Sequence, residues 1–177
     1  MRLLPDTHIL ESIHRYDLVT FGWCLRRKRR DALVKVSRYV SRSADGHLYV
    51  IAAATLAFYQ NWPMVWLLAA AFSAERLVYF VSKHHFKRNR PPAAIPGFEA
   101  VIKPSDQFSF PSGHTSAAFL TAGILSYAFP YLAPLLYPWA CAVGFSRVML
   151  GVHFPSDIVA GALLGHTLGI LILAVAV

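Results

Sequence analysis

Residues 111–129 read PSGHTSAAFLTAGILSYAF, and this stretch decides the fold. From Thr115 to Phe129 it carries no charge, which predicts a long helix that starts near Ser112. The preceding proline suits a first helical turn, because its missing N–H would be unpaired anyway. Ser112 can cap the free N–H groups that follow. The positive end of this helix then lies beside His114, which predicts a site for an anion.

Two further stretches carry side chains suited to the same anion. Lys83 precedes Arg90 by seven positions, about two helical turns, so both side chains can point to one side of a helix end. Arg147 adds a third cation, whose planar guanidinium suits phosphate. His153 is followed four positions later by Asp157, a spacing that lets a carboxylate orient an imidazole. These groups meet the main needs of phosphoryl transfer, which are charge neutralisation and positioning.

Together the three stretches resemble the signature of the type-2 phosphatidic acid phosphatase superfamily. This family comprises integral-membrane lipid phosphatases related to acid phosphatases and vanadium haloperoxidases. The resemblance covers residues 83–157 in detail, whereas residues 1–45 carry none of it. All eleven specified positions of the signature match in order and spacing: Lys83, Arg90, Pro91, Pro111, Ser112, Gly113, His114, Ser146, Arg147, His153 and Asp157.

The resemblance implies a role for most of the matched residues. His153 would attack phosphorus, Asp157 would orient it, and His114 would protonate the leaving oxygen. Ser146 would have a supporting hydrogen-bond role. Backbone N–H groups near the Pro-Ser-Gly-His motif would complete the cradle. The phosphate-binding residues would be Lys83, Arg90, Ser112, Gly113 and Arg147.

Composition indicates a membrane protein. Hydrophobic residues make up 56% of the chain and charged residues 15%, against about 25% in globular proteins. The net charge is +8. The basic residues lie beside membrane-length apolar runs, which favours anionic lipid headgroups or a phosphate substrate and argues against nucleic acid. Cys141 lies inside an apolar run, so the two cysteines do not indicate a disulfide framework.

The predicted fold class is all-α, a polytopic membrane helix bundle. Two amphipathic interfacial helices, over about 6–25 and 31–42, precede about five transmembrane helices. Residues 1–45 are expected to form a basic membrane-surface segment, and residues 46–177 the transmembrane phosphatase domain. The transmembrane helices are expected over about 47–60, 64–88, 112–129, 134–151 and 156–176. Anionic headgroups are expected to bind a basic run formed by Arg26, Arg27, Lys28, Arg29 and Arg30.

The connectivity predicts that the three motifs lie on one membrane face, because each is found at an end of one of the last four helices. Glu75 and Arg76 would be costly at mid-membrane depth, so we expect an ion pair that faces the bundle interior or another helix. A strip of glycines recurs every four residues in the last helix and predicts close helix packing within the chain. It comprises Gly161, Gly165 and Gly169.

The leading functional hypothesis is a metal-independent lipid phosphatase with a phosphohistidine intermediate. Candidate substrates are undecaprenyl pyrophosphate, phosphatidylglycerol phosphate and phosphatidic acid. The alternative is a non-catalytic lipid-phosphate binding or transport protein, which would need the cations but not an oriented nucleophile. A vanadate-dependent oxidase is a third possibility that five membrane helices disfavour. A metal site is also disfavoured, because the three motif cations would repel a divalent ion.

The sequence gives two opposed indications of orientation. The expected location is a cell membrane, with the bacterial inner membrane favoured by the resemblance. The basic residues flanking the first membrane helix favour a cytoplasmic catalytic face by the positive-inside rule. The bacterial phosphatases that the chain resembles usually work on the outer face, and we expect that side on resemblance alone.

Overall fold

The computed structural model describes residues 5–26 and 30–176, and within these ranges the chain is helical apart from turns and loops. Residues 27–29 of the predicted basic run lie outside the described residues. The two N-terminal helices and the two short elements are α1 (Pro5–Leu25), α2 (Arg30–Ser43), α5 (Pro91–Ala94) and the 3-10 helix η1 (Pro130–Leu132). The bundle helices are α3 (His47–Phe58), α4 (Trp62–Phe86), α6 (Gly113–Ala128), α7 (Ala133–Met149) and α8 (Pro155–Ala176).

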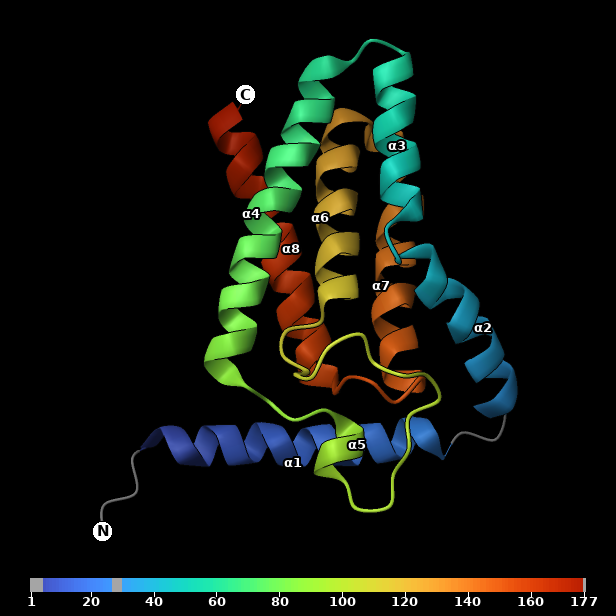
Figure 1. The fold of residues 1–177 in the computed structure, drawn as a ribbon, viewed down its shortest axis with the longest axis vertical. Helices are drawn as coiled ribbons and strands as arrows, with labels where there is room; N and C mark the ends of the chain where they lie inside the picture. The colour runs from blue at the N-terminus through green and yellow to red at the C-terminus, as the bar shows by residue number, and fades with distance from the viewer. Residues whose placement is uncertain (1–4, 27–29, 177) are drawn as a thin grey trace.

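The five longer helices after residue 46 stand side by side, and α1 lies across one end of them (Figure 1). Helix α6 occupies the middle of this bundle and packs mainly against α7 and α8. Helix α4 ends, α6 begins, α7 ends and α8 begins at the end of the bundle nearest α1. The predicted convergence of the three motifs on one face is therefore confirmed.

The length and composition of each helix show whether it could cross a membrane as predicted. Helices α4 and α8 are long and apolar enough to cross a membrane. Helix α3 has 12 residues, about 18 Å at about 1.5 Å per residue, which is short of the roughly 30 Å hydrocarbon core. The helical fold class is confirmed, and the number of five spans stays a prediction.

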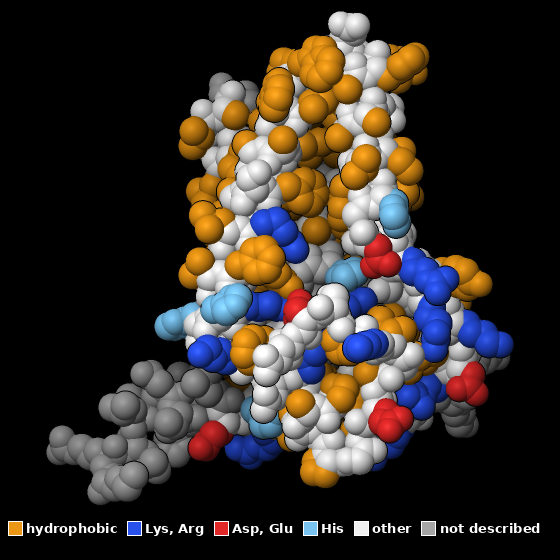
Figure 2. Space-filling model, in the orientation of Figure 1, with side chains coloured by type: hydrophobic (Ala, Val, Ile, Leu, Met, Phe, Trp, Pro, Cys, Tyr) orange, Lys and Arg blue, Asp and Glu red, His pale blue; other side chains and the backbone are white. Residues whose placement is uncertain are grey.

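Apolar and charged side chains separate along the bundle axis. Figure 2 shows hydrophobic side chains over the upper part of the bundle and most of the charged ones over the lower part, beside α1 and α2. The upper half of the bundle is packed around Leu68, Leu120 and Ile124, which are at most 5% exposed. This arrangement leaves the motif-bearing end as the polar end of the molecule.

Helix α8 packs directly on the backbone of α6 through its glycines. A Cβ atom at Gly161 would lie 2.5 Å from the carbonyl oxygen of Ser112, and one at Gly165 would lie 2.0 Å from that of Ser116. Real Cβ atoms do not approach so closely, so glycine is required at both positions. The predicted intramolecular role of the glycine strip is confirmed, and it fixes α8 against the start of α6.

Glu75 and Arg76 form the predicted ion pair. Two guanidinium nitrogens of Arg76 donate to the Glu75 carboxylate at 2.5 and 2.7 Å. Glu75 is fully buried and Arg76 reaches toward the start of α6, where it contacts the carbonyl of Gly113 at 3.4 Å. A buried carboxylate is thus paired, as its desolvation requires.

Candidate active site

The end of α4 and the chain after it bring Lys83 and Arg90 to one carboxylate that the signature does not contain. Asp106 lies in the connecting loop (residues 95–112), and its Oδ1 accepts hydrogen bonds from Lys83 and from Arg90 Nη2, the latter at 2.6 Å. The Tyr79 hydroxyl donates to Asp106 Oδ2 at 2.7 Å. Burial opposes ionisation of Asp106, but hydrogen bonds from Lys83, Arg90 and Tyr79 hold the pKa of its carboxyl well below the usual range.

The connecting loop folds back along the first motif. Lys83 Nζ donates to the carbonyl of Phe108 at 2.7 Å, and the Ser109 N–H donates to the carbonyl of Arg88 at 2.8 Å. Arg90 also donates through Nε to the backbone carbonyl of Asp106 at 2.9 Å. These bonds fix the position of the Asp106 carboxylate between the two motif cations.

His153 is held between Arg90 and Asp157 in the turn that joins α7 to α8. Its Nε2 lies 3.1 Å from Arg90 Nη1, and its Nδ1 lies 3.7 Å from Asp157 Oδ2. The second distance is an ion-pair approach that is too long for a hydrogen bond, and Nδ1 has no hydrogen-bond partner in the described structure. The predicted pairing thus occurs as proximity, without the direct hydrogen bond.

Burial decides the protonation state of His153. Its side chain is 2% exposed. Burial lowers the pKa of the imidazole to about 3, and the neighbouring Asp157 carboxylate only partly opposes that shift. His153 is therefore neutral at neutral pH, which is the state that a nucleophile needs.

Asp157 is oriented by groups other than His153. Its Oδ1 accepts from Arg88 at 2.7 Å and its Oδ2 accepts from the N–H of Phe154 at 2.8 Å. Arg88 in turn donates at 2.5 Å to Asp17, which is 3% exposed on α1. Asp17 also accepts from the backbone N–H and the hydroxyl of Ser156. Helix α1 is thereby joined to the start of α8, where Asp157 lies.

His114 pairs with a second carboxylate. Its Nε2 and Asp45 Oδ1 are joined by a hydrogen bond of 2.7 Å. Asp45 follows α2, so this bond links the N-terminal segment to the first turn of α6. The two histidines of the signature therefore each lie beside an aspartate.

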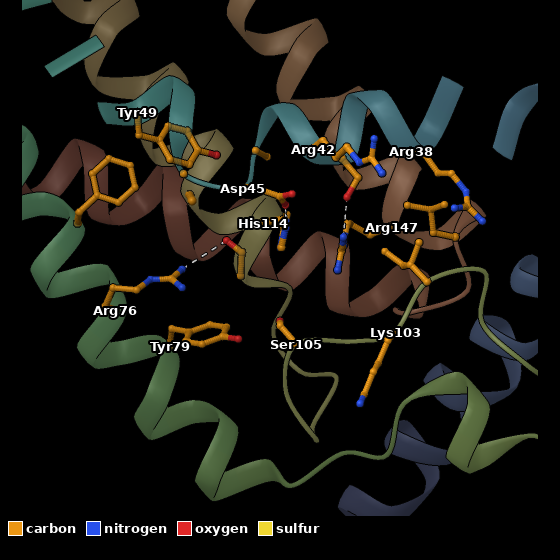
Figure 3. A pocket seen from close by; sticks show the side chains of 18 residues that line it. Arg38, Arg42, Asp45, Tyr49, Arg76, Tyr79, Lys103, Ser105, His114 and Arg147 are labelled. Atoms are coloured by element: carbon orange, nitrogen blue, oxygen red, sulfur yellow. Dashed lines mark hydrogen bonds and ion pairs between the residues drawn. The ribbon is translucent and has the colours of Figure 1, made fainter. Parts of the chain in front are cut away.

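Arg147 and His114 line one cavity of about 630 Å³. Arg147 is 4% exposed, its Nη1 donates to the hydroxyl of Ser41 on α2 at 2.6 Å, and its Nε has no hydrogen-bond partner in the described structure. Figure 3 shows Arg147 and His114 in the middle of this cavity, between Arg76 on one side and Arg38 on the other. The lining includes 18 described residues, and His153 is not among them.

The comparisons with known proteins agree with the geometry. The family model of the PAP2 superfamily matches residues 63–177. The chain belongs to the PAP2 superfamily. Its fold resembles the crystal structure of Aquifex aeolicus LpxE, with a TM-score of 0.79 at 27% identity, covering 89% of this chain and 94% of that one. It also resembles the transmembrane PAP2 type phosphatidylglycerolphosphate phosphatase from Bacillus subtilis, with a TM-score of 0.76 at 28% identity, covering 93% of this chain and 86% of that one.

A curated PAP2 relative is the decaprenylphosphoryl-5-phosphoribose phosphatase of Mycobacterium tuberculosis. The two chains are 33% identical over 111 residues, which is 60% of this chain and 59% of the relative. The chain thus spans well under two thirds of the length of that protein. A membrane location agrees with these comparisons, because the B. subtilis neighbour is a transmembrane protein.

Two motif positions of the PAP2 signature, Ser112 and Pro111, differ from their predicted contacts. Ser112 precedes the first residue of α6 but makes no capping hydrogen bond, because its hydroxyl bonds to Thr115 Oγ1 at 2.9 Å. Its N–H donates to the backbone carbonyl of Asp157 at 3.0 Å and is not free for an anion. Pro111 lies outside the first turn, because α6 begins at Gly113.

Gly113 and Ser146 serve packing within the PAP2 fold. A Cβ atom at Gly113 would lie 2.7 Å from the Tyr79 ring, so glycine lets α4 and α6 approach each other. The Ser146 hydroxyl donates to the carbonyl of Val143 at 2.6 Å within α7. The supporting hydrogen bond predicted for Ser146 is therefore made to its own helix.

The sequence prediction missed the carboxylates and the arginine that hold the PAP2 residues in place. Asp45, Asp106 and Asp17 come from loops or from α1, and no spacing rule connects them to the motifs. Arg88 lies two residues before Arg90, and its position between two matched cations was the one available signal. All four are partners that only the folded chain brings together.

Proposed function

We propose that the chain is a lipid phosphatase that acts through a phosphohistidine on His153. The observation that carries this proposal is the placement of the imidazole between a cation and a carboxylate. Its Nε2 faces Arg90, which can hold a phosphate oxygen, and its Nδ1 faces Asp157. A protein that only bound the phosphate would have no need of a neutral, oriented imidazole beside the cations.

The reaction would proceed in two steps. The lone pair on His153 Nε2 forms a bond to phosphorus while the bond from phosphorus to the lipid oxygen breaks, and His114 gives that oxygen a proton. Asp157 stabilises the proton on Nδ1. Water then attacks the phosphohistidine with His114 as base, which releases phosphate and restores His153.

Phosphate release by the purified protein tests this function. Lipid monophosphates and diphosphates in detergent should yield inorganic phosphate, and the rate should be the same with an excess of chelator. Lys83, Arg90 and Arg147 already supply the positive charge that a metal ion would bring. Lipid binding without phosphate release would support the transport alternative, and loss of activity with chelator that magnesium restores would contradict the metal-independent mechanism.

The substrate phosphate would take the position of the Asp106 carboxylate. That carboxylate bridges Lys83 and Arg90, the cations that the signature assigns to phosphate. A phosphate on the same two cations would lie beside His153 Nε2, because Arg90 contacts both. Asp106 is one third exposed, so its side chain has solvent on one side into which it can withdraw.

Substitution Asp106→Asn should strengthen inhibition by orthovanadate. The neutral amide competes less well for Lys83 and Arg90, so the vanadate concentration for half inhibition should fall roughly tenfold, the effect of about 1.4 kcal/mol. Glu99→Gln is the matched control, because Glu99 is an exposed carboxylate of the same loop. Weaker vanadate inhibition of the Asp106 variant would show instead that this carboxylate holds the two cations in place.

The relatives suggest the class of lipid. Those in M. tuberculosis and B. subtilis are named for phosphate groups on a prenyl-linked sugar and on phosphatidylglycerol. The candidate substrates remain phosphatidylglycerol phosphate, undecaprenyl pyrophosphate and phosphatidic acid. Anionic headgroups would bind the basic run from Arg26 to Arg30.

We infer a catalytic face on the outer side of a bacterial inner membrane, with about five helices crossing it. A Glu99→Cys variant in a Cys24→Ser, Cys141→Ser background tests this orientation, because Glu99 is exposed on the motif side. A membrane-impermeant thiol reagent should label the variant on intact cells whose outer membrane has been made permeable. Labelling that requires disruption of the inner membrane would place the site in the cytoplasm.

A further inference from the structure

The cavity contains a second group of cations that the PAP2 signature does not include. Arg38 and Arg42 on α2 and Lys103 in the connecting loop line it. Figure 3 shows these three side chains on the side of Arg147 away from Arg76. They belong to segments far apart in the sequence, so the fold gathers them around one space.

The register of α2 directs its arginines to this space. Arg38, Ser41 and Arg42 have the spacing i, i+3 and i+4, which places them on one face of α2, and Asp45 lies in the turn directly after that helix. Ser41 accepts the buried hydrogen bond from Arg147, and Asp45 binds the proposed general acid. Arg38 and Arg42 therefore flank the contact between α2 and the catalytic motifs.

The positive charges of this second group are not neutralised by ion pairs within the described part of the chain. None of the ion pairs within residues 5–26 and 30–176 involves Arg38, Arg42 or Lys103. Arg38 donates one hydrogen bond, to the carbonyl of Val101 at 3.1 Å, which leaves most of its five donors for a ligand. Five lysines and arginines but one carboxylate, Asp45, line the cavity, and of these five cations only Arg76 has an ion-pair partner among the described residues, Glu75. A phosphate monoester brings at most about two negative charges, so one phosphate leaves a positive excess.

We propose that Arg38, Arg42 and Lys103 form a second phosphate subsite beside the catalytic centre. The substrate class is a lipid with two phosphate groups in its polar head, of which one reacts at His153 and the other binds this subsite. The proposal rests on the proposed phosphatase function and narrows its substrates. Both a diphosphate and two phosphates joined through a short polyol have the required chemistry.

Two matched pairs of lipids test the subsite. One pair is a prenyl diphosphate and its monophosphate, and the other is phosphatidylglycerol phosphate and phosphatidic acid with the same acyl chains. The Arg38→Gln/Arg42→Gln and Lys103→Gln variants should lose roughly tenfold to a hundredfold in kcat/KM on the two-phosphate lipids, the range for a lost hydrogen bond to a charged group. On the one-phosphate lipids the change should stay within about threefold. The pair that shows the larger loss identifies the spacing of the two phosphates.

Lys35→Gln is the matched control. Lys35 lies on the same helix and is exposed, but it does not line the cavity. It should leave all four rates unchanged. Equal losses on one- and two-phosphate lipids, or equal losses in the Lys35 variant, would overturn the subsite and show a general attraction of anionic lipids. If the wild-type protein hydrolyses none of the four lipids, both the phosphatase function and the subsite are wrong. If the wild-type protein hydrolyses them but the variants lose the same rate on one- and two-phosphate lipids, only the subsite is wrong.

Discussion

Replacing His153 with alanine is expected to reduce phosphate release by about 10⁶-fold, to the background rate, as loss of a catalytic nucleophile does in other enzymes. The imidazole lies between Arg90 and Asp157, and its removal takes away the group proposed to form the bond to phosphorus. The measurement is single-turnover phosphate release from a lipid phosphate in detergent. Binding of the lipid should persist, because Lys83, Arg90 and Arg147 remain.

The matched control is His84→Ala. His84 is exposed in the last turn of α4, at the same end of the bundle, and among the described residues its ring has one hydrogen-bond partner, the carbonyl of Phe80. The control should retain the wild-type rate. Substantial turnover by the His153 variant would exclude His153 as nucleophile, whatever the control shows.

The Asp157→Asn variant should lose about 10⁴-fold in kcat, the loss seen when the carboxylate that orients a catalytic histidine becomes an amide. KM should change little, because Asp157 contacts Arg88 and Phe154 and reaches the substrate only through His153. The amide cannot stabilise the proton that Nδ1 carries in the transition state. The measurement is the full dependence of rate on lipid concentration for both proteins.

A thermal unfolding scan separates this effect from damage to the fold, because Asp157 also anchors the start of α8. Asp31→Asn serves as control, since Asp31 is exposed in the first turn of α2. A rise in KM at unchanged kcat would contradict the proposed role and would assign Asp157 to substrate binding. A variant that keeps its melting temperature and its kcat would also contradict it.

The sequence was sufficient to predict the positions of the helices and the end of the bundle at which the three motifs meet. Apolar runs and helix-end signals are local properties, so the bounds of α4, α6, α7 and α8 fall within a few residues of those expected. The glycine strip also has a local cause, since four-residue spacing puts all three glycines on one side of α8. These predictions needed no contact between distant parts of the chain.

The partners of the motif residues depend on contacts between distant parts of the chain and could not be predicted. Asp106 reaches Lys83 and Arg90 because the connecting loop folds back on the end of α4. Asp45 meets His114 because α2 packs on α7. The amphipathic composition of α2 predicted a helix on the membrane surface and did not indicate this packing. Charged residues in irregular segments have no periodicity that would reveal their direction.

The role of α2 changes with these contacts. Its arginines were expected to serve membrane attachment and topology, yet Arg38 and Arg42 line the cavity. Like the motif cations, they are therefore weak indicators of which side of the membrane is cytoplasmic, which reduces the conflict with an outer catalytic face. The basic run before α2 still favours a cytoplasmic catalytic face by the positive-inside rule.

The central claim is a covalent phosphate on His153, and trapping that intermediate tests it most directly. The purified protein is mixed with a lipid labelled in its reacting phosphate, quenched in alkali within the first turnover, digested and analysed by mass spectrometry. The account predicts label on the peptide that contains His153, and none on it in the His153→Ala protein. Label on another residue, or phosphate release at the full rate with no phosphorylated peptide at any time, would contradict it.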